Sequence, residues 1–357
     1  MVFPNKPLSL KNNDFISKDI CNFINENINL FREERLHIGN TVIVIYTVLN
    51  GQREPPGLAS IAAKIYTKVY GWAKPTSVPL VCYLFLLDYP KRLDVLFKSD
   101  ITSDECNSGS TTFDLKEKGR KFTEVMLWRQ EEWEKVFYHE LIHAFHLDTL
   151  ALTSQHKMDA KLRKRLPFYN NTIQEAYAEV LATVLACQDK KVMNFKDEII
   201  FMGSQVNKII YFYHSAQNGH VDKLEELARN KTPNPFPVAT IENESMIWAF
   251  FSQYSSSSEE EEKEDLTNCN FASYYILKSI YFWASLADPQ LIQVSNLLDP
   301  DFVNKNFYAT LLKSLKSGDY VEWLARIYFV PTTDSLKMTL SLWYFKKNWI
   351  KTNTNNK

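Results

Sequence analysis

Hydrophobic residues recur at intervals that divide the first 90 residues into helical and strand-like segments. After a polar arm over residues 1–15, apolar side chains at helical spacing predict a helix over residues 16–35. Residues 41–49 are β-branched and apolar almost throughout, which predicts a buried strand. A further helix is predicted over residues 59–70, and a second apolar strand over residues 78–87.

The middle of the chain reads as a hairpin followed by helices. A polar loop over residues 99–111 leads to a hairpin formed by Thr112–Phe113 and residues 121–128. Apolar residues at helical spacing then predict helices over about residues 130–147, 172–188 and 196–229.

The last third of the chain separates a linker from a helical region. Residues 233–237 are rich in proline, and residues 255–265 are acidic, serine-rich and of low complexity, which predicts a tether. Beyond the linker, apolar residues at helical spacing predict five helices, over residues 270–287, 291–298, 303–316, 319–329 and 333–350.

Composition narrows the classes of protein that fit. The chain has 357 residues with 45% hydrophobic side chains, enough for a core, and a net charge of −1, which argues against a nucleic-acid footprint. Five scattered cysteines argue against a disulfide framework, and no apolar leader or membrane span is recognisable. We therefore expect a cytoplasmic or other reducing compartment. The amino-acid composition, rich in Lys, Asn, Ile and Phe, indicates an AT-rich genome such as that of a virus or parasite.

The helix expected near residues 130–147 contains the motif with the clearest chemistry. His139, Glu140 and His143 form an H-E-x-x-H pattern. Positions i and i+4 share one helix face, so the two imidazoles can bind one Zn²⁺ ion. Glu140 lies roughly 100° around the helix, where it can accept a proton from the attacking water without binding the metal. The competing interpretation is a core helix whose histidines are satisfied by hydrogen bonds. The uncharged residues around the motif favour the metal site.

A third ligand is needed, and two interpretations compete. His146 lies on the same stripe as His139, but their Cα atoms would be about 10.5 Å apart along the helix. We therefore expect His146 to support the site or line a substrate pocket. In the later helix, Glu175 and Glu179 are again i and i+4, and they are the only charges in an otherwise uncharged run. One could complete the zinc shell and the other could orient a ligand histidine. Alternatively, Glu175 forms a capping box with Thr172, and Glu179 lies on a solvated face.

This combination resembles the gluzincins, the thermolysin-like branch of zinc metallopeptidases. The resemblance covers residues 110–190 and implies that Glu175 is the third zinc ligand and that Glu179 holds His139. The sequence Glu-Ala-Tyr-Ala-Glu, residues 175–179, is also similar to the second helix of the lethal-factor-like toxin peptidases. This resemblance implies that Tyr169, six residues before Glu175, lies near the position of the tyrosine that stabilises the oxyanion in those enzymes.

The resemblance also implies a fold and a mode of substrate binding. The expected fold class is α+β: an N-terminal arm and helix, a zincin-like catalytic domain, a linker and an all-helical region, over residues 1–35, 36–230, 231–266 and 267–357. Residues 121–128 would be the edge strand next to the active-site helix, where an extended peptide can pair through main-chain hydrogen bonds.

The leading hypothesis is therefore a zinc-dependent metallopeptidase with one Zn²⁺ per chain, a peptide or protein substrate and Glu140 as general base. The alternative is a non-catalytic helical interaction or structural protein that keeps a zincin-like fold or a metal site. A zinc hydrolase acting on substrates other than peptides is a third class that the motif permits.

Overall fold

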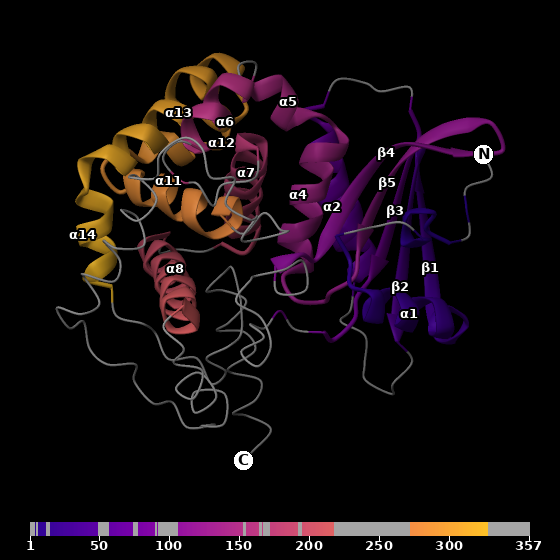
Figure 1. The fold of residues 1–357 in the computed structure, drawn as a ribbon. Coiled ribbons are helices and arrows are strands. Elements are labelled where there is room, and N and C mark those ends of the chain that lie inside the picture. The colour runs from indigo at the N-terminus through magenta and orange to yellow at the C-terminus, as the bar shows by residue number, and fades with distance from the viewer. Residues whose placement is uncertain are drawn as a thin grey trace. The chain divides into compact units, whose positions relative to one another are not determined.

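The computed structural model describes residues 4, 6–11, 15–48, 57–73, 78–89, 91, 106–152, 155–163, 166, 172–191, 195–217 and 272–327. The chain forms two units, one from residues 1–90 and 107–150 and the other from residues 91–106 and 151–357. The fold class is α+β, with a small mixed sheet in the first unit and helices in the second (Figure 1).

The first unit is built around a five-stranded sheet with the order β1-β2-β3-β5-β4. The outer pairs, β1 with β2 and β4 with β5, are antiparallel, whereas β3 is parallel to both of its neighbours. The strands are β1 (Phe31–Ile38), β2 (Thr41–Val48), β3 (Leu80–Phe85), β4 (Gly109–Glu117) and β5 (Arg120–Leu127).

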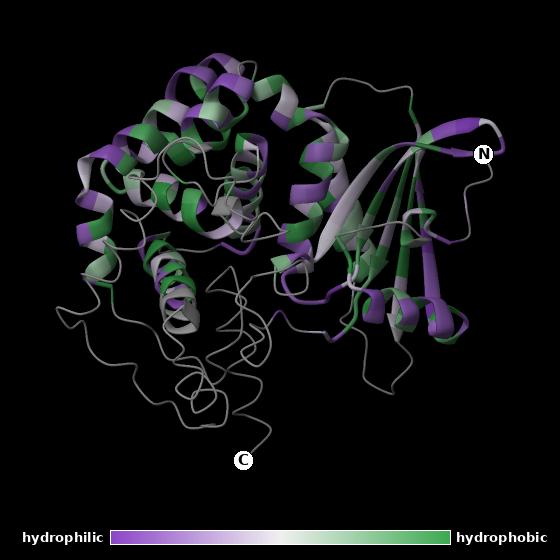
Figure 2. Cartoon of the chain, in the orientation of Figure 1, coloured by the Kyte–Doolittle hydropathy of each residue, from purple (hydrophilic) through white to green (hydrophobic). Residues whose placement is uncertain are grey.

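Alternating side chains of the central strands bury both faces of this sheet. On one face, Val44 and Tyr83 join a core with α1 (Lys18–Asn27) and the N-terminal residues. The opposite face carries α2 (Leu58–Tyr70) and α4 (Trp133–Ala144). Burial on both faces explains why β3 is apolar along its whole length and β2 is apolar apart from Thr41 and Thr47 (Figure 2).

Two expectations about these strands were wrong. The helix expected over residues 16–35 ends early, in a short 3₁₀ turn over Ile28–Leu30, and β1 begins at Phe31. The Phe31 ring packs edge-on against a stacked aromatic pair, Tyr46 and Phe85, and this contact across strands outweighs the local helical spacing.

The strand over residues 121–128 is also not the sheet edge, because β5 lies between β3 and β4. Among the described strands, the edge on this side of the sheet is β4. A peptide that extends the sheet next to α4 would therefore pair with β4.

The N-terminal arm is anchored to the sheet where it is described. The main-chain N–H groups of Leu8 and Ser9 donate to the Glu124 carboxylate at 2.8 and 3.1 Å, and the Ser9 hydroxyl donates to it as well. The Tyr83 hydroxyl donates to the carbonyl of Pro4 at 2.7 Å. A short 3₁₀ turn, Ser9–Lys11, follows. A buried carboxylate on β5 thus fixes the first residues against the sheet.

We expect the stability of this anchor to depend on pH. Burial raises the pKa of Glu124 above its ordinary value of 4.5, although hydrogen bonds from Ser9 and Leu8 act in the opposite direction. The native state then binds this proton more tightly than the unfolded state does. The unfolding free energy of the wild type relative to Glu124→Gln should therefore fall as pH rises from about 4.5 through the folded-state pKa. Urea unfolding of both proteins between pH 4 and 8 measures this difference, and a difference independent of pH would contradict it.

The second unit is helical throughout its described part. Predicted helices over residues 172–188, 303–316 and 319–329 correspond to α7, α13 and α14, and the pattern over residues 196–229 corresponds to α8 where it is described. The segments are α6 (Gln155–Arg163), α7 (Ile173–Asp189), α8 (Phe195–Gln217), the π-helical turn η3 (Ala272–Leu277), α11 (Lys278–Ala284), η4 (Pro289–Ile292), α12 (Val294–Leu297), α13 (Pro300–Ser317) and α14 (Asp319–Ala325). The expected linkers at residues 233–237 and 255–265 and the helix at 333–350 lie outside the described residues.

Helix α7 is the most deeply buried element of this unit, because almost every residue from Ala176 to Cys187 is inaccessible to solvent. Thr172 is the residue before its first turn, as predicted, but its side chain makes no capping hydrogen bond. Instead, the Ile173 N–H donates to Asp159 of α6 at 2.7 Å. The Tyr177 hydroxyl donates to the carbonyl of Leu297 at 2.6 Å. Contacts from distant parts of the unit therefore hold α7.

The described helices include none that is long and apolar enough to span a membrane.

Candidate metal centre

Helix α4 carries the H-E-x-x-H motif and begins three residues later than the pattern predicts. The Gln130 N–H donates to the carbonyl of Leu87, and Glu132 adopts a left-handed conformation with φ of 56°, so the helix starts at Trp133. It ends at Ala144, and His146 again has a left-handed φ of 56°. Histidine tolerates this conformation better than most residues. The chain turns there into the short helix α5 (Leu147–Ala151).

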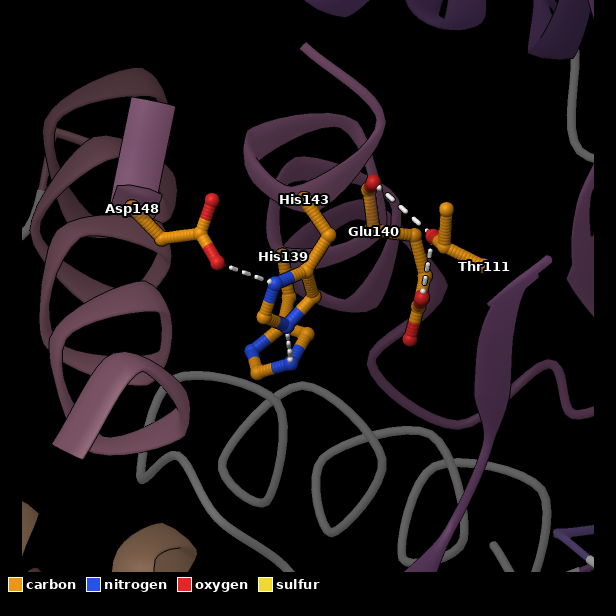
Figure 3. A network of polar contacts seen from close by, with 5 residues as sticks. All are labelled: Thr111, His139, Glu140, His143 and Asp148. Carbon is orange, nitrogen blue, oxygen red and sulfur yellow. Dashed lines mark hydrogen bonds and ion pairs between the residues drawn. The ribbon is translucent and has the colours of Figure 1, made fainter. Parts of the chain in front are cut away.

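His139 and His143 point the same ring atom toward one place. Their Nε2 atoms lie 3.0 Å apart (Figure 3). Two nitrogens on one tetrahedral zinc ion, with bonds of 2.0–2.1 Å, would be separated by about 3.3 Å. His139 is buried and His143 is half-buried. The i and i+4 positions thus bring the two Nε2 atoms together, at a distance that also fits a direct hydrogen bond between the rings.

Asp148 of α5 fixes the orientation of His143. Its Oδ2 lies 2.9 Å from His143 Nδ1. The side chain of Asp148 is only 7% exposed. When an ionised carboxylate accepts from Nδ1–H of an imidazole, the lone pair on Nε2 is left for another partner. Asp148 is not among the site residues that the sequence predicts. The signal that could have revealed it is its position, because it is the only acidic residue between 141 and 158.

The carboxylate of Glu140 lies on a different side of α4, against strand β4. The Thr111 hydroxyl is 2.7 Å from Glu140 Oε2 and 3.0 Å from the main-chain carbonyl of Glu140. Figure 3 shows the carboxylate directed toward Thr111, while the two imidazoles converge elsewhere. Glu140 is therefore buried next to the histidines without sharing their point of convergence.

His146, the expected supporting residue, is exposed and stacks on another ring. Its ring lies 4.9 Å from that of Phe113 on β4, at an interplanar angle of 18°. The left-handed turn after α4 places it there, and this arrangement makes it part of the surface beside the motif.

The two glutamates of α7 belong to the second unit. Glu175 is half-buried in the first turn of the helix. Glu179 is buried, and its Oε1 accepts a hydrogen bond from Lys278 Nζ at 3.0 Å. The side chains of this ion pair are 3% and 1% exposed, so Glu179 is not on a solvated face. That Glu175 binds the metal and that Glu179 holds His139 both stay predictions. Tyr169 lies outside the described residues.

Comparisons with models of known protein families, with curated proteins and with solved structures found no match for this chain.

Proposed function

We propose that this protein is a zinc-dependent metallopeptidase of the zincin type. In this proposal, His139, His143 and Glu175 hold one zinc ion and Glu140 is the general base. The observation that carries it is the convergence of two Nε2 atoms at 3.0 Å, with one imidazole oriented by Asp148. Such a pair, one helical turn apart and beside a buried glutamate, is the arrangement that metal-assisted hydrolysis uses.

The proposed donors suit a catalytic zinc site better than a structural one. Two imidazoles and one carboxylate leave one position for water or substrate, whereas structural sites are usually closed and rich in cysteine. The four cysteines in the described part of the chain are free thiols, and none of them belongs to the proposed ligand set.

Glu140 and Asp148 have different roles in the proposed hydrolysis. When zinc is bound, it polarises a carbonyl group and lowers the pKa of its water to about 7. Glu140 accepts a proton from the attacking water and delivers it to the leaving amine. Asp148 keeps His143 in the tautomer that presents Nε2. Burial of Glu140 strengthens its electrostatic interactions relative to those in bulk water.

The metal content of the purified protein tests the proposal directly. Inductively coupled plasma mass spectrometry should find about one zinc per chain in the wild type, and His143→Ala and Glu175→Gln should both lose it. Loss in His143→Ala alone would remove Glu175 from the ligand set. Absence of zinc from every form, even after zinc is added back, would contradict the metallopeptidase proposal and favour a helical interaction protein.

Removal of the carboxylate at Asp148 should weaken metal binding without abolishing it. Asp148→Ala leaves His143 free to rotate and to protonate at Nε2, so we expect zinc affinity to fall by roughly 10–100-fold. Competition with a chromophoric chelator measures the affinity. Asp114→Ala, in the exposed β4–β5 hairpin, is the matched control. Equal affinities in the two variants would show that Asp148 does not support the ligand.

A further inference from the structure

Strand β4 presents alternate residues to the helix that carries the motif. Positions i and i+2 share one face of a strand, and three such positions contact α4 or the turn after it. Gly109 faces Val136 and Glu140, Thr111 bonds to Glu140, and Phe113 stacks on His146. Glu140 thus meets two neighbouring positions of this face, Gly109 and Thr111.

Gly109 supplies space for the glutamate. A methyl group added at this position would lie 2.9 Å from Glu140 Cγ, 2.9 Å from its Oε1 and 2.9 Å from Val136 Cγ1. Real Cβ atoms do not approach other atoms so closely, and therefore a larger residue would force the side chains of Glu140 and Val136 to shift. The glycine is needed for close approach, since its φ is not in the left-handed region.

Thr111 orients the carboxylate of Glu140. Its hydroxyl has one proton, and the carboxylate oxygen at 2.7 Å is a stronger and nearer acceptor than the helix carbonyl at 3.0 Å. A hydrogen bond to Oε2 restricts rotation of the carboxylate. Because Gly109 lies against Oε1, both oxygens of Glu140 have a fixed neighbour on β4.

We infer that Gly109 and Thr111 are positioning residues, which hold the carboxylate of Glu140 in one orientation for proton transfer. The inference rests on the proposed function, because it assigns the orientation of the proposed general base to an edge strand. A purely structural role is the alternative, in which the Thr111 hydroxyl only joins strand and helix.

The first test uses the metal-free protein and needs no activity. Thr111→Val keeps the shape of the side chain but removes the hydroxyl, and Glu140→Met removes its acceptor. Glu140→Met keeps the main-chain carbonyl at position 140, so only the contact with the carboxylate differs between the two backgrounds. If the hydroxyl holds the carboxylate, Thr111→Val should lower the urea midpoint more in the wild type than in Glu140→Met. An equal loss in both backgrounds would overturn the inference. Thr112→Val, one residue along on the other face of β4, is the control and should show no such difference.

The second test separates turnover from binding, with a peptide substrate and the zinc-loaded protein. Thr111→Val and Gly109→Ala should each reduce kcat by about 10–100-fold, while KM and zinc content stay within twofold of the wild type. Thr111→Ser keeps the hydroxyl and should recover most of the loss.

The outcomes distinguish the two proposals. An unchanged kcat in Thr111→Val, beside an inactive Glu140→Gln, would overturn only the positioning role. The same holds if Thr111→Ser is as impaired as Thr111→Val, since packing would then explain the loss. A fully active Glu140→Gln would instead overturn the proposed function.

Discussion

Glu140→Gln should retain zinc and lose about 10²–10⁴-fold in kcat. The amide has nearly the same shape as the carboxylate and can still accept the hydrogen bond from Thr111, but it cannot take a proton from water. The imidazoles of His139 and His143 converge without Glu140, so metal binding should not need it. Hydrolysis of a peptide library, followed by mass spectrometry beside a metal assay, measures both quantities.

A matched substitution on the same helix is the control for this prediction. Glu134→Gln makes the same chemical change in the first turn of α4 and should leave kcat within a small factor of the wild type. Loss of zinc from Glu140→Gln would identify Glu140 as a ligand and contradict the assigned role. Cleavage of small amides, but not of peptides, would move the substrate to another class.

Lys278→Met should destabilise the protein by about 3–5 kcal/mol, because it leaves the Glu179 charge buried without this partner. The two side chains are 1% and 3% exposed, so water cannot replace the lost ion pair. Lys278→Met together with Glu179→Met should recover most of the stability, since an apolar pair of similar volume carries no desolvation cost. Urea unfolding of the three variants gives the free energies.

The control for this ion pair is an exposed lysine of the same unit. Lys305→Met on α13 changes the same atoms at the surface and should shift the unfolding free energy by less than about 0.5 kcal/mol. A double variant as unstable as Lys278→Met would show that the loss comes from packing around residue 278 and not from an uncompensated carboxylate.

The spacing of apolar residues predicted an element correctly where that element's own sequence determines its structure. β2 and α7 are long, apolar and bounded by polar residues, so periodicity located both within one or two residues. Periodicity failed at residues 31–35, because the helical spacing of apolar residues continues to Phe31, whereas the Phe31 ring packs against two neighbouring strands. The spacing of apolar residues also could not predict the order of the strands in the sheet. The position of β5 inside the sheet depends on pairing with β3, about 40 residues earlier.

The same distinction applies to the candidate site. The spacing of His139 and His143 fixes their relation because both lie on one helix. The partners of the motif come from elsewhere. Thr111 reaches Glu140 across 29 residues, and Lys278 reaches Glu179 across 99. Asp148 is only five residues from His143, but the left-handed turn at His146 brings it there, and helical spacing gives no sign of that turn.

The burial of α7 has a consequence for the order in which the protein is made. Tyr177 of this helix bonds to Leu297, which follows 120 residues later. At roughly 5–20 residues per second, a ribosome needs about 6–24 s to add them. Until residues 278 and 297 have been added, Glu179 and Tyr177 lack these two native contacts. The helix that carries Glu175 therefore reaches its final environment late in synthesis, long after α4 and the sheet have emerged. A nascent or shortened chain that ends before residue 278 should hold the two histidines in place but should not assemble α7.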